Sequence, residues 1–428
     1  MELSRCDFNL KGKKAEKLVH DLALKTFLTD WCYLNPTLPN GKELCDFLVV
    51  YDEVAIIWQI KDLKLDRRGR YRSRDVEGNL HQLSGARRQL FTLKTPVEIE
   101  NPRRGKELFN AAEIREIYLI SVLLGEGEDI FSFVESIKNY TIHVFTRDFT
   151  QIILDELDTI SDFTNYIRAK ESITKQDKQI IILGGEEELL AFYLQNNKSF
   201  GRLNEATHVM IEQGLWERFQ NSQEYRAKKD EDKISYIWDS IINRAHEGSV
   251  EYEKVARELA RPNRFERRYL SKAYVDGQIR AESDTRYDVF RRTIAGSGVT
   301  YCFVFGDDPE PRGRRRNMLL NMCWIARGTF KENRKVIGIA SEKQVRRMRS
   351  YDFCLIDLPE WTEENQKQME KLQQETGILL SPEIGIAHEE EYTRSNKRIN
   401  LFSSCLLAIS TNPGRNEKIS QILVDEIS

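Results

Sequence analysis

The sequence has few of the features that stabilise or anchor proteins outside the cytosol. Its 428 residues include only seven cysteines, and no two of them form a CxxC pair. We therefore expect neither a disulfide scaffold nor a zinc ribbon, and we interpret the cysteines as reduced thiols in a cytosolic protein. The first residues are polar and precede no apolar signal core. The longest apolar runs, such as residues 117–124, are far shorter than the roughly 18–20 residues that span a bilayer, so we expect no membrane contact.

Several catalytic motifs are also missing. The chain has no G-x-x-x-x-G-K-[ST] loop, which argues against an intrinsic NTPase, and no H-E-x-x-H motif. The six histidines show no spacing typical of metal ligands, and the Gly-Ser-Gly at residues 296–298 precedes a predicted strand instead of following one. These absences leave ordinary globular domains whose chemistry must come from other side chains.

Charge is balanced overall but unevenly distributed. The chain carries 65 Lys and Arg against 68 Asp and Glu, a net charge of −3. Between residues 257 and 349, however, 22 Lys and Arg stand against 11 Asp and Glu, which gives a local net charge of +11. Arginine clusters of this kind suit contacts with phosphates, and we interpret Arg314, Arg315 and Arg316 as candidate nucleic-acid-binding residues. The alternatives are a solvated face, or pairing with the acidic remainder of the chain.

The hydrophobic pattern predicts a mixed α/β protein in three parts. Residues 1–147 are expected to form an α/β domain that contains a charged connector over 64–74, residues 148–272 a mainly helical region, and residues 273–428 a second α/β domain. The predicted helices lie near residues 11–30, 75–93, 149–170, 186–195, 205–219, 234–245, 252–259 and 362–376. The predicted strands lie near residues 44–50, 54–62, 116–124, 140–146, 300–305, 335–340 and 351–358.

Two of these apolar runs predict a β-hairpin with a defined register. Residues 44–50 and 54–62 are separated by little more than Asp52-Glu53. If these two residues form the turn, Asp46 lies opposite Gln59, and directly opposed side chains have Cβ atoms about 4.5–5.5 Å apart. Lys61 shares the face of Gln59 because side chains alternate along a strand. The other face is apolar and is expected to face the core, with Cys45, Phe47, Val49, Ile56, Trp58 and Ile60.

A carboxylate, an amide and an ammonium on one face suit metal-assisted phosphodiester chemistry. Mg²⁺ prefers oxygen ligands and keeps several waters, so Asp46 can supply a carboxylate while Gln59 or the Ile60 carbonyl adds an oxygen. A bound metal lowers the pKa of a water and polarises a phosphate. Lys61 can orient that water or stabilise charge in the transition state. The sequence therefore predicts a site for Mg²⁺ or Mn²⁺ on this hairpin.

These residues resemble the motif of the PD-(D/E)XK, or restriction-endonuclease-like, nuclease superfamily. The match is Asp46 followed by Gln59-Ile60-Lys61, and the predicted elements of residues 1–147 can be read as the αβββαβ core of that family. The resemblance implies a metal-dependent nuclease, with DNA favoured over RNA as its substrate. It also implies a further metal-site glutamate on the first helix, for which Glu16 is the candidate. On the helix after the hairpin, Gln82 and Arg87 become candidates for contact with nucleic acid.

The sequence departs from the usual family pattern at two positions. Cys45 stands where the family usually has a proline, and Gln59 replaces the second acid, as in Mrr-like branches of the family. A neutral amide binds a divalent cation more weakly than a carboxylate does, so metal binding is expected to depend on Glu16 or Glu43. The resemblance covers about a third of the chain.

The expected protein is therefore a cytosolic metal-dependent nuclease whose remaining parts select, activate or restrain its N-terminal domain. Such an architecture suits bacterial defence against foreign DNA, with a protein partner or a second copy of the chain as the restraint. Two alternatives stay open. The chain is a non-catalytic subunit that uses a nuclease fold for interaction or nucleic-acid binding, or it recognises RNA through its basic region.

Overall fold

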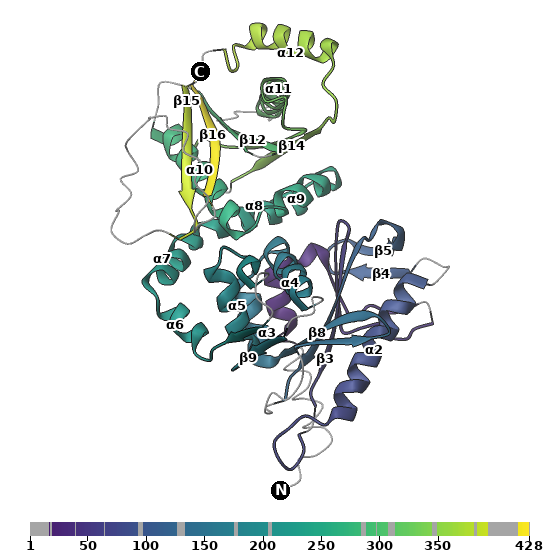
Figure 1. The fold of residues 1–428 in the computed structure, drawn as a ribbon. Helices are drawn as coiled ribbons and strands as arrows, with labels where there is room; N and C mark the ends of the chain where they lie inside the picture. Colours follow the sequence, from purple (N-terminus) through teal and green to yellow (C-terminus); the bar gives the residue numbers. More distant parts are fainter. Residues whose placement is uncertain are drawn as a thin grey trace. The chain divides into compact units, whose positions relative to one another are not determined.

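The computed structural model shows a mixed α/β protein in two compact units, Met1–Asn221 and Ser222–Ser428 (Figure 1). It describes residues 17, 19–38, 40–63, 65–92, 97–125, 133–174, 179–203, 208–283, 288–296, 298–306, 313–344, 349–380, 383–392 and 418–427. The division after Asn221 falls inside the region expected to form a helical middle part, so helices of that region belong to both units.

The first unit is built on a six-stranded sheet. In spatial order its strands are β1 (Cys32–Leu34), β2 (Phe47–Tyr51), β3 (Val54–Lys61), β6 (Glu116–Leu123), β8 (Tyr140–Thr146) and β7 (Val134–Ile137). The central strands β3, β6 and β8 run parallel, and the other neighbours pair antiparallel. Two smaller sheets pair β4 (Val97–Asn101) with β5 (Gly105–Phe109) and β9 (Gln179–Ile182) with β10 (His208–Ile211).

Helices accompany these sheets in the first unit. They are an N-terminal helix described over residues 19–27, α2 (Ser73–Thr92), α3 (Arg147–Glu156), α4 (Ile160–Thr174), α5 (Glu186–Gln195) and α6 (Leu215–Asn221). Short 3-10 turns are η1 (Thr29–Trp31), η2 (Ala111–Glu113) and η3 (Gly201–Leu203). The expected single helix over 149–170 is broken into α3 and α4, because the Thr159 hydroxyl caps α4 by accepting the Asp162 amide at 3.0 Å.

The register predicted for the β2–β3 hairpin is confirmed. Tyr51 pairs with Val54, and the ladder continues to Phe47 opposite Trp58. Asp52 takes a φ of 49°, in the left-handed region that aspartate tolerates better than most residues. Two turn residues are therefore enough to reverse the chain and to fix which side chains oppose each other.

The apolar face of this hairpin was expected to face the core, and the structure buries both faces along most of the hairpin's length. Ile57 and Trp58 point to opposite faces, and both are 0% exposed. Ile57 belongs to the core under α2, while Trp58 packs against Phe27 and Phe163 with ring centroids 6.1 and 5.6 Å away. Sheets with parallel central strands are normally covered on both faces. Polar side chains are therefore confined to the end of the hairpin.

The second unit has its own six-stranded sheet and core. In spatial order its strands are β14 (Tyr351–Asp357), β13 (Lys335–Ser341), β12 (Val299–Gly306), β11 (Val289–Ala295), β16 (Lys418–Ile427) and β15 (Glu383–Glu390). Only β12 and β13 pair in parallel. The predicted strands near 300–305, 335–340 and 351–358 correspond to β12, β13 and β14.

Helices cover both faces of this second sheet (Figure 1). They are α7 (Gln223–Asp232), α8 (Tyr236–His246), α9 (Glu253–Ala260), α10 (Arg264–Ser283), α11 (Gly313–Thr329) and α12 (Glu363–Thr376), with 3-10 turns η4 (Lys233–Ser235) and η5 (Val250–Tyr252). On one face, α11 packs its apolar side on β12 and β13. On the other, Trp238 of α8 packs edge-to-face against Tyr301 and Phe303, with centroids 5.7 and 6.3 Å away.

Two sequence predictions outside the hairpin need correction or comment. The helix expected over 205–219 is instead β10 followed by α6, because Gly214 takes a φ of 84° between them. Helix α11 was missed, since its first turn was interpreted only as a run of arginines. Within the described parts of the chain, every helix is too short or too polar to traverse a bilayer.

Candidate active site

Asp46 lies one residue before β2, at the end of the hairpin where β3 finishes. Its Oδ2 accepts hydrogen bonds from Gln59 Nε2 at 2.6 Å and from the Ile60 backbone N–H at 2.5 Å. Asp46 is 9% exposed and Gln59 is 6% exposed, so both are buried. The hairpin register thus brings together the acid and the amide that the sequence paired. No residue in the described structure bonds to Asp46 Oδ1, which leaves this oxygen for another partner.

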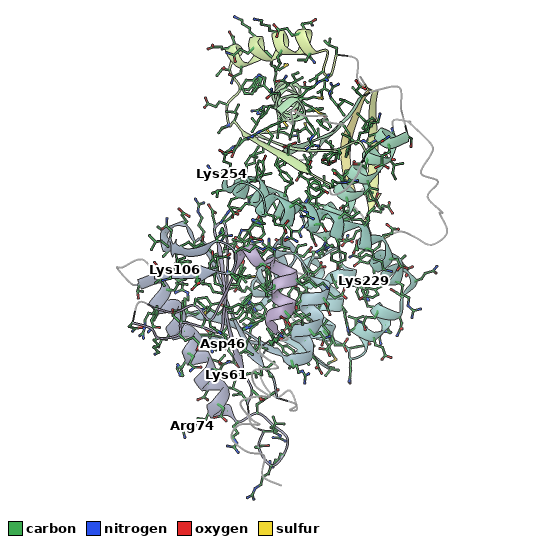
Figure 2. The ribbon with its side chains drawn as sticks, turned by 180° about the vertical axis from the view of Figure 1, so that it is seen from behind. Asp46, Lys61, Arg74, Lys106, Lys229 and Lys254 are labelled. Atoms are coloured by element: carbon green, nitrogen blue, oxygen red, sulfur yellow. The ribbon has the colours of Figure 1, made fainter. Side chains whose placement is uncertain are left out.

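Charge around Asp46 is set by burial and by Lys61. Burial raises the pKa of the Asp46 carboxyl, although the Ile60 amide, the Lys61 ammonium and the Gln59 amide pull in the opposite direction. Lys61 is half-buried, and no described carboxylate lies within ion-pair distance of it. Figure 2 labels Asp46 and Lys61 near each other at this end of the first unit. The site therefore combines a carboxylate whose charged form is disfavoured by burial with an ammonium that forms no ion pair with any carboxylate in the described structure.

Glu43 adds a second carboxylate. Burial and the neighbouring Asp46 raise the pKa of Glu43, whereas Lys61 lowers it. With its amide nitrogen facing the acceptors, Asn35 donates to Glu43 Oε1 at 3.2 Å and to the Asp46 carbonyl at 2.9 Å. The Asn35 backbone N–H donates to that same carbonyl at 3.1 Å. The loop after β1 therefore holds Glu43 within electrostatic range of Asp46 and Lys61.

The N-terminal helix reaches this site through His20. The His20 ring hydrogen-bonds to the backbone carbonyl of Asp46, and its centroid lies 5.7 Å from that of Phe47. Burial lowers the pKa of His20, and its Nε2 has no hydrogen-bond partner among the residues that the structure describes. Glu16, the glutamate expected from this helix, lies outside the described residues.

Asn79 of α2 is a site residue that the sequence did not single out. Gln59 pairs with Ser121 of β6, and the Ser121 hydroxyl accepts a hydrogen bond from Asn79 Nδ2 at 2.7 Å. Asn79 is 2% exposed, and its Oδ1 is buried with no partner in the described parts of the chain. A polar row therefore continues from Asp46 through Gln59 and Ser121 to Asn79. The helix face alone could have indicated it, because Val76, Leu80 and Leu83 line the same side.

The two residues predicted on α2 differ in their surroundings. Gln82 is exposed, and Arg87 packs its guanidinium 4.0 Å from the centre of the Tyr140 ring. The strand pairings set Tyr140 level with Ala55. Because a strand rises about 3.3 Å per residue, Ala55 is roughly 20 Å from Lys61. Arg87 therefore lies toward the opposite end of the sheet from Asp46, and its contact with a nucleic acid stays a prediction.

The charged connector over 64–74, which runs from the end of β3 into the first turn of α2, lies at the site instead. Tyr71 donates its hydroxyl hydrogen to the Gly125 carbonyl, and the neighbouring Leu124 amide donates to the Lys61 carbonyl at 2.9 Å. The connector is thereby tied to the end of β6, beside β3. Four of its arginines are exposed, and no described carboxylate forms an ion pair with them: Arg67, Arg68, Arg72 and Arg74. Arg74 is labelled with Asp46 and Lys61 in Figure 2.

Much of the basic region of the second unit is occupied by internal ion pairs. Arg315 is 4% exposed and contacts Asp352 at 2.6 Å and the Ser350 hydroxyl at 2.9 Å, so it is not free to meet a phosphate as predicted. Arg314 and Arg316 are exposed on the same helix turn. The buried arginines Arg267, Arg268 and Arg292 pair with Asp239, Asp232 and Asp276. The alternative of pairing with acidic residues therefore holds for these side chains.

The donors present suit a metal ion that needs few protein ligands. Among the described residues, no group of three or more His, Cys, Asp or Glu side chains could hold a metal. Glu43, Asp46 Oδ1 and the Gln59 carbonyl oxygen are oxygen donors, which fit Mg²⁺ or Mn²⁺ because these ions retain several waters. They do not fit a closed zinc site, which needs four protein ligands.

No protein-family model matches this chain, and neither a curated protein nor a solved structure matches it.

Proposed function

We propose that the first unit is a metal-dependent nuclease, with DNA favoured over RNA as its substrate. The observation that carries the proposal is the buried Asp46 carboxylate. It accepts hydrogen bonds from the Gln59 side chain and the Ile60 backbone amide, and the Lys61 ammonium lies within electrostatic range of it. A buried carboxylate without a direct cationic partner is costly to fold. A purely structural hairpin would be more stable with an apolar side chain at this position, so the arrangement favours a chemical role.

Each side chain has a task in such a reaction. When bound, Mg²⁺ or Mn²⁺ would lower the pKa of a water and polarise the scissile phosphate. Asp46 Oδ1 and Glu43 would hold the ion, and Gln59 keeps the Asp46 carboxylate in one orientation through its amide hydrogen bond. The Lys61 ammonium neutralises charge that develops on the phosphate. Glu16 and the Ile60 carbonyl remain further candidate ligands.

The exposed arginines of the connector supply the binding surface for a polyanion. They project from a segment that is bonded to the strand ends next to Lys61. Phosphate contacts of this kind position a nucleic acid without reading its sequence. We therefore propose that the connector, and not Gln82 or Arg87, guides the backbone of the substrate to Asp46.

The proposal is tested with the full-length protein on plasmid DNA, linear DNA and RNA, with Mg²⁺, Mn²⁺ or a chelator. Asp46→Ala and Lys61→Ala should lower the cleavage rate by about 10²–10⁴-fold each. Glu98→Ala and Lys106→Ala, an exposed ion pair on the β4–β5 hairpin, are the matched controls and should cleave as the wild type does. Equal residual activity in wild type, Asp46→Ala and Lys61→Ala would indicate a contaminating nuclease and overturn the proposal.

The second candidate is a non-catalytic nucleic-acid-binding or interaction subunit. The observation that favours it is the absence of a third acid near Asp46 within the described residues, because a neutral Gln59 weakens metal binding. Under this alternative, Arg72→Ala and Arg74→Ala together weaken DNA binding while no variant, and no metal, produces cleavage. Regulation by the second unit, a protein partner or a second copy belongs to the same proposal, and defence against foreign DNA is the biological setting it suits.

A further inference from the structure

Three neighbouring strands of the second unit place two cysteines on either side of a glycine. Cys302 of β12 pairs with Gly338 of β13, and Gly338 pairs with Cys354 of β14. Directly paired residues in adjacent strands direct their side chains to the same face of a sheet. The thiols of Cys302 and Cys354 therefore flank a position that has no side chain. Both cysteines belong to the hydrophobic core under α11.

A third cysteine fills the gap above the glycine. The Sγ of Cys323, on α11, lies 2.4 Å from the point where a Cβ at Gly338 would be. Any side chain at Gly338 would thus displace this sulfur. Cys323 thus lies between Cys302 and Cys354, and the three thiols form one contiguous cluster. Among the described residues these cysteines are free thiols.

The three thiols differ in their surroundings. Cys302 is 0% exposed on an inner strand and contacts the Thr293 hydroxyl at 3.8 Å. Cys354 is 6% exposed on β14, which is the edge strand of the sheet. The neighbouring Cys323 thiol lowers the pKa of Cys354, burial raises it, and Arg316 lowers it further. Burial and its thiol neighbours raise the pKa of Cys323 instead.

We propose that Cys354 and Cys323 are a hydroperoxide-reactive thiol pair, with Cys354 the attacking sulfur and Cys323 the resolving one. A reactive cysteine beside a cation and next to a second thiol is the arrangement that redox-sensitive proteins use. Cys302 is excluded from the first step because it is fully buried on an inner strand.

The chemistry balances with a hydroperoxide as the oxidant. The Cys354 thiolate attacks one peroxide oxygen, the O–O bond breaks, and the alkoxide or hydroxide that leaves takes the thiol proton. The product is a Cys354 sulfenic acid. The Cys323 sulfur then attacks the Cys354 sulfur, the S–O bond breaks, and water leaves with the Cys323 proton. Two thiols lose two electrons in total, and the peroxide gains them; a dithiol reverses the reaction.

The test uses the full-length reduced protein and hydrogen peroxide. After treatment, free thiols are alkylated and the digest is analysed by mass spectrometry. We expect a Cys323–Cys354 disulfide that dithiothreitol removes. In Cys323→Ser, a Cys354 sulfenic acid should accumulate and react with dimedone, whereas Cys302→Ser should form the same disulfide as the wild type. Cleavage of nucleic acid is not part of the readout, so the result is independent of the proposed nuclease activity.

Two further variants test the geometry. Arg316→Gln should slow the oxidation of Cys354, and Gly338→Ala should slow disulfide formation by displacing the Cys323 sulfur. Thermal unfolding of each variant shows whether it is folded. The proposal is overturned if folded wild type yields neither the disulfide nor, in Cys323→Ser, the dimedone adduct at peroxide levels that oxidise a small thiol. It is equally overturned if Cys302 is cross-linked as readily as Cys354.

Discussion

The two units contain arginines that look alike in the sequence and differ in the structure. Those of the connector, such as Arg67, Arg72 and Arg74, are exposed and form no ion pair with a described carboxylate. Those of the second unit, such as Arg268 and Arg315, are buried and paired. A local charge excess therefore does not identify a phosphate-binding surface. What matters is whether acidic partners come together with the arginines in the fold.

The largest expected effect tests the buried side of this comparison. Arg315→Met removes the guanidinium partner of Asp352, and breaking a buried ion pair from one side costs about 3–5 kcal/mol. We expect urea unfolding to show a loss of this size. Arg314 lies on the same turn of α11 but is exposed, so Arg314→Met is the matched control. It should change the unfolding free energy by less than about 0.5 kcal/mol. Similar losses for both variants would show that the pairing of Arg315 contributes little.

A smaller effect separates the inner and outer faces of α2. Asn79→Ala should slow cleavage by about tenfold. The substitution removes the hydrogen bond from Asn79 to the Ser121 hydroxyl beside Gln59, and one buried hydrogen bond is worth roughly 1–1.5 kcal/mol. Gln82→Ala, exposed one turn further along the helix, should cleave at the wild-type rate. Initial rates at saturating metal, with melting temperatures as a control for folding, measure both. The opposite order would restore Gln82 as the functional residue of this helix.

The smallest effect concerns pH in the second unit. Burial alone would raise the pKa of Glu342, but hydrogen bonds from the Ser350 hydroxyl and amide, together with Arg315, lower it overall. A carboxyl whose pKa is lower in the folded state stabilises the fold above its unfolded pKa, about 4.3, and loses this contribution as pH falls through its folded pKa. Glu342→Gln should therefore be less stable than wild type near pH 7, by less than about 1 kcal/mol. The difference should shrink below pH 4; a gap that widens there would contradict the sign.

The sequence predicted the hairpin well because its information is local. Two apolar runs and the two-residue turn between them determine the pairing of Phe47 with Trp58, and this pairing sets Asp46 beside Gln59. No long-range knowledge is needed for that inference.

Residues that reach the site from elsewhere in the chain were not predictable in the same way. Glu43, Asn35 and His20 meet Asp46 through loop and helix packing, and Asn79 does so through Ser121 of a strand 42 residues later. For the same reason the place of Arg87 was not predictable, because its position along α2 could not be related to the direction of β3 without the sheet.

The length of the turn at Asp52 and Glu53 sets the pairing of Asp46 with Gln59, about 20 Å away along the hairpin. An insertion or deletion of one residue there would slide one strand past the other by a single step. Asp46 would then meet an apolar neighbour in place of Gln59, and Trp58 would be moved from its aromatic layer to the face covered by α2. Among descendants of this gene, the length of that turn is thus expected to be under tighter selection than its composition.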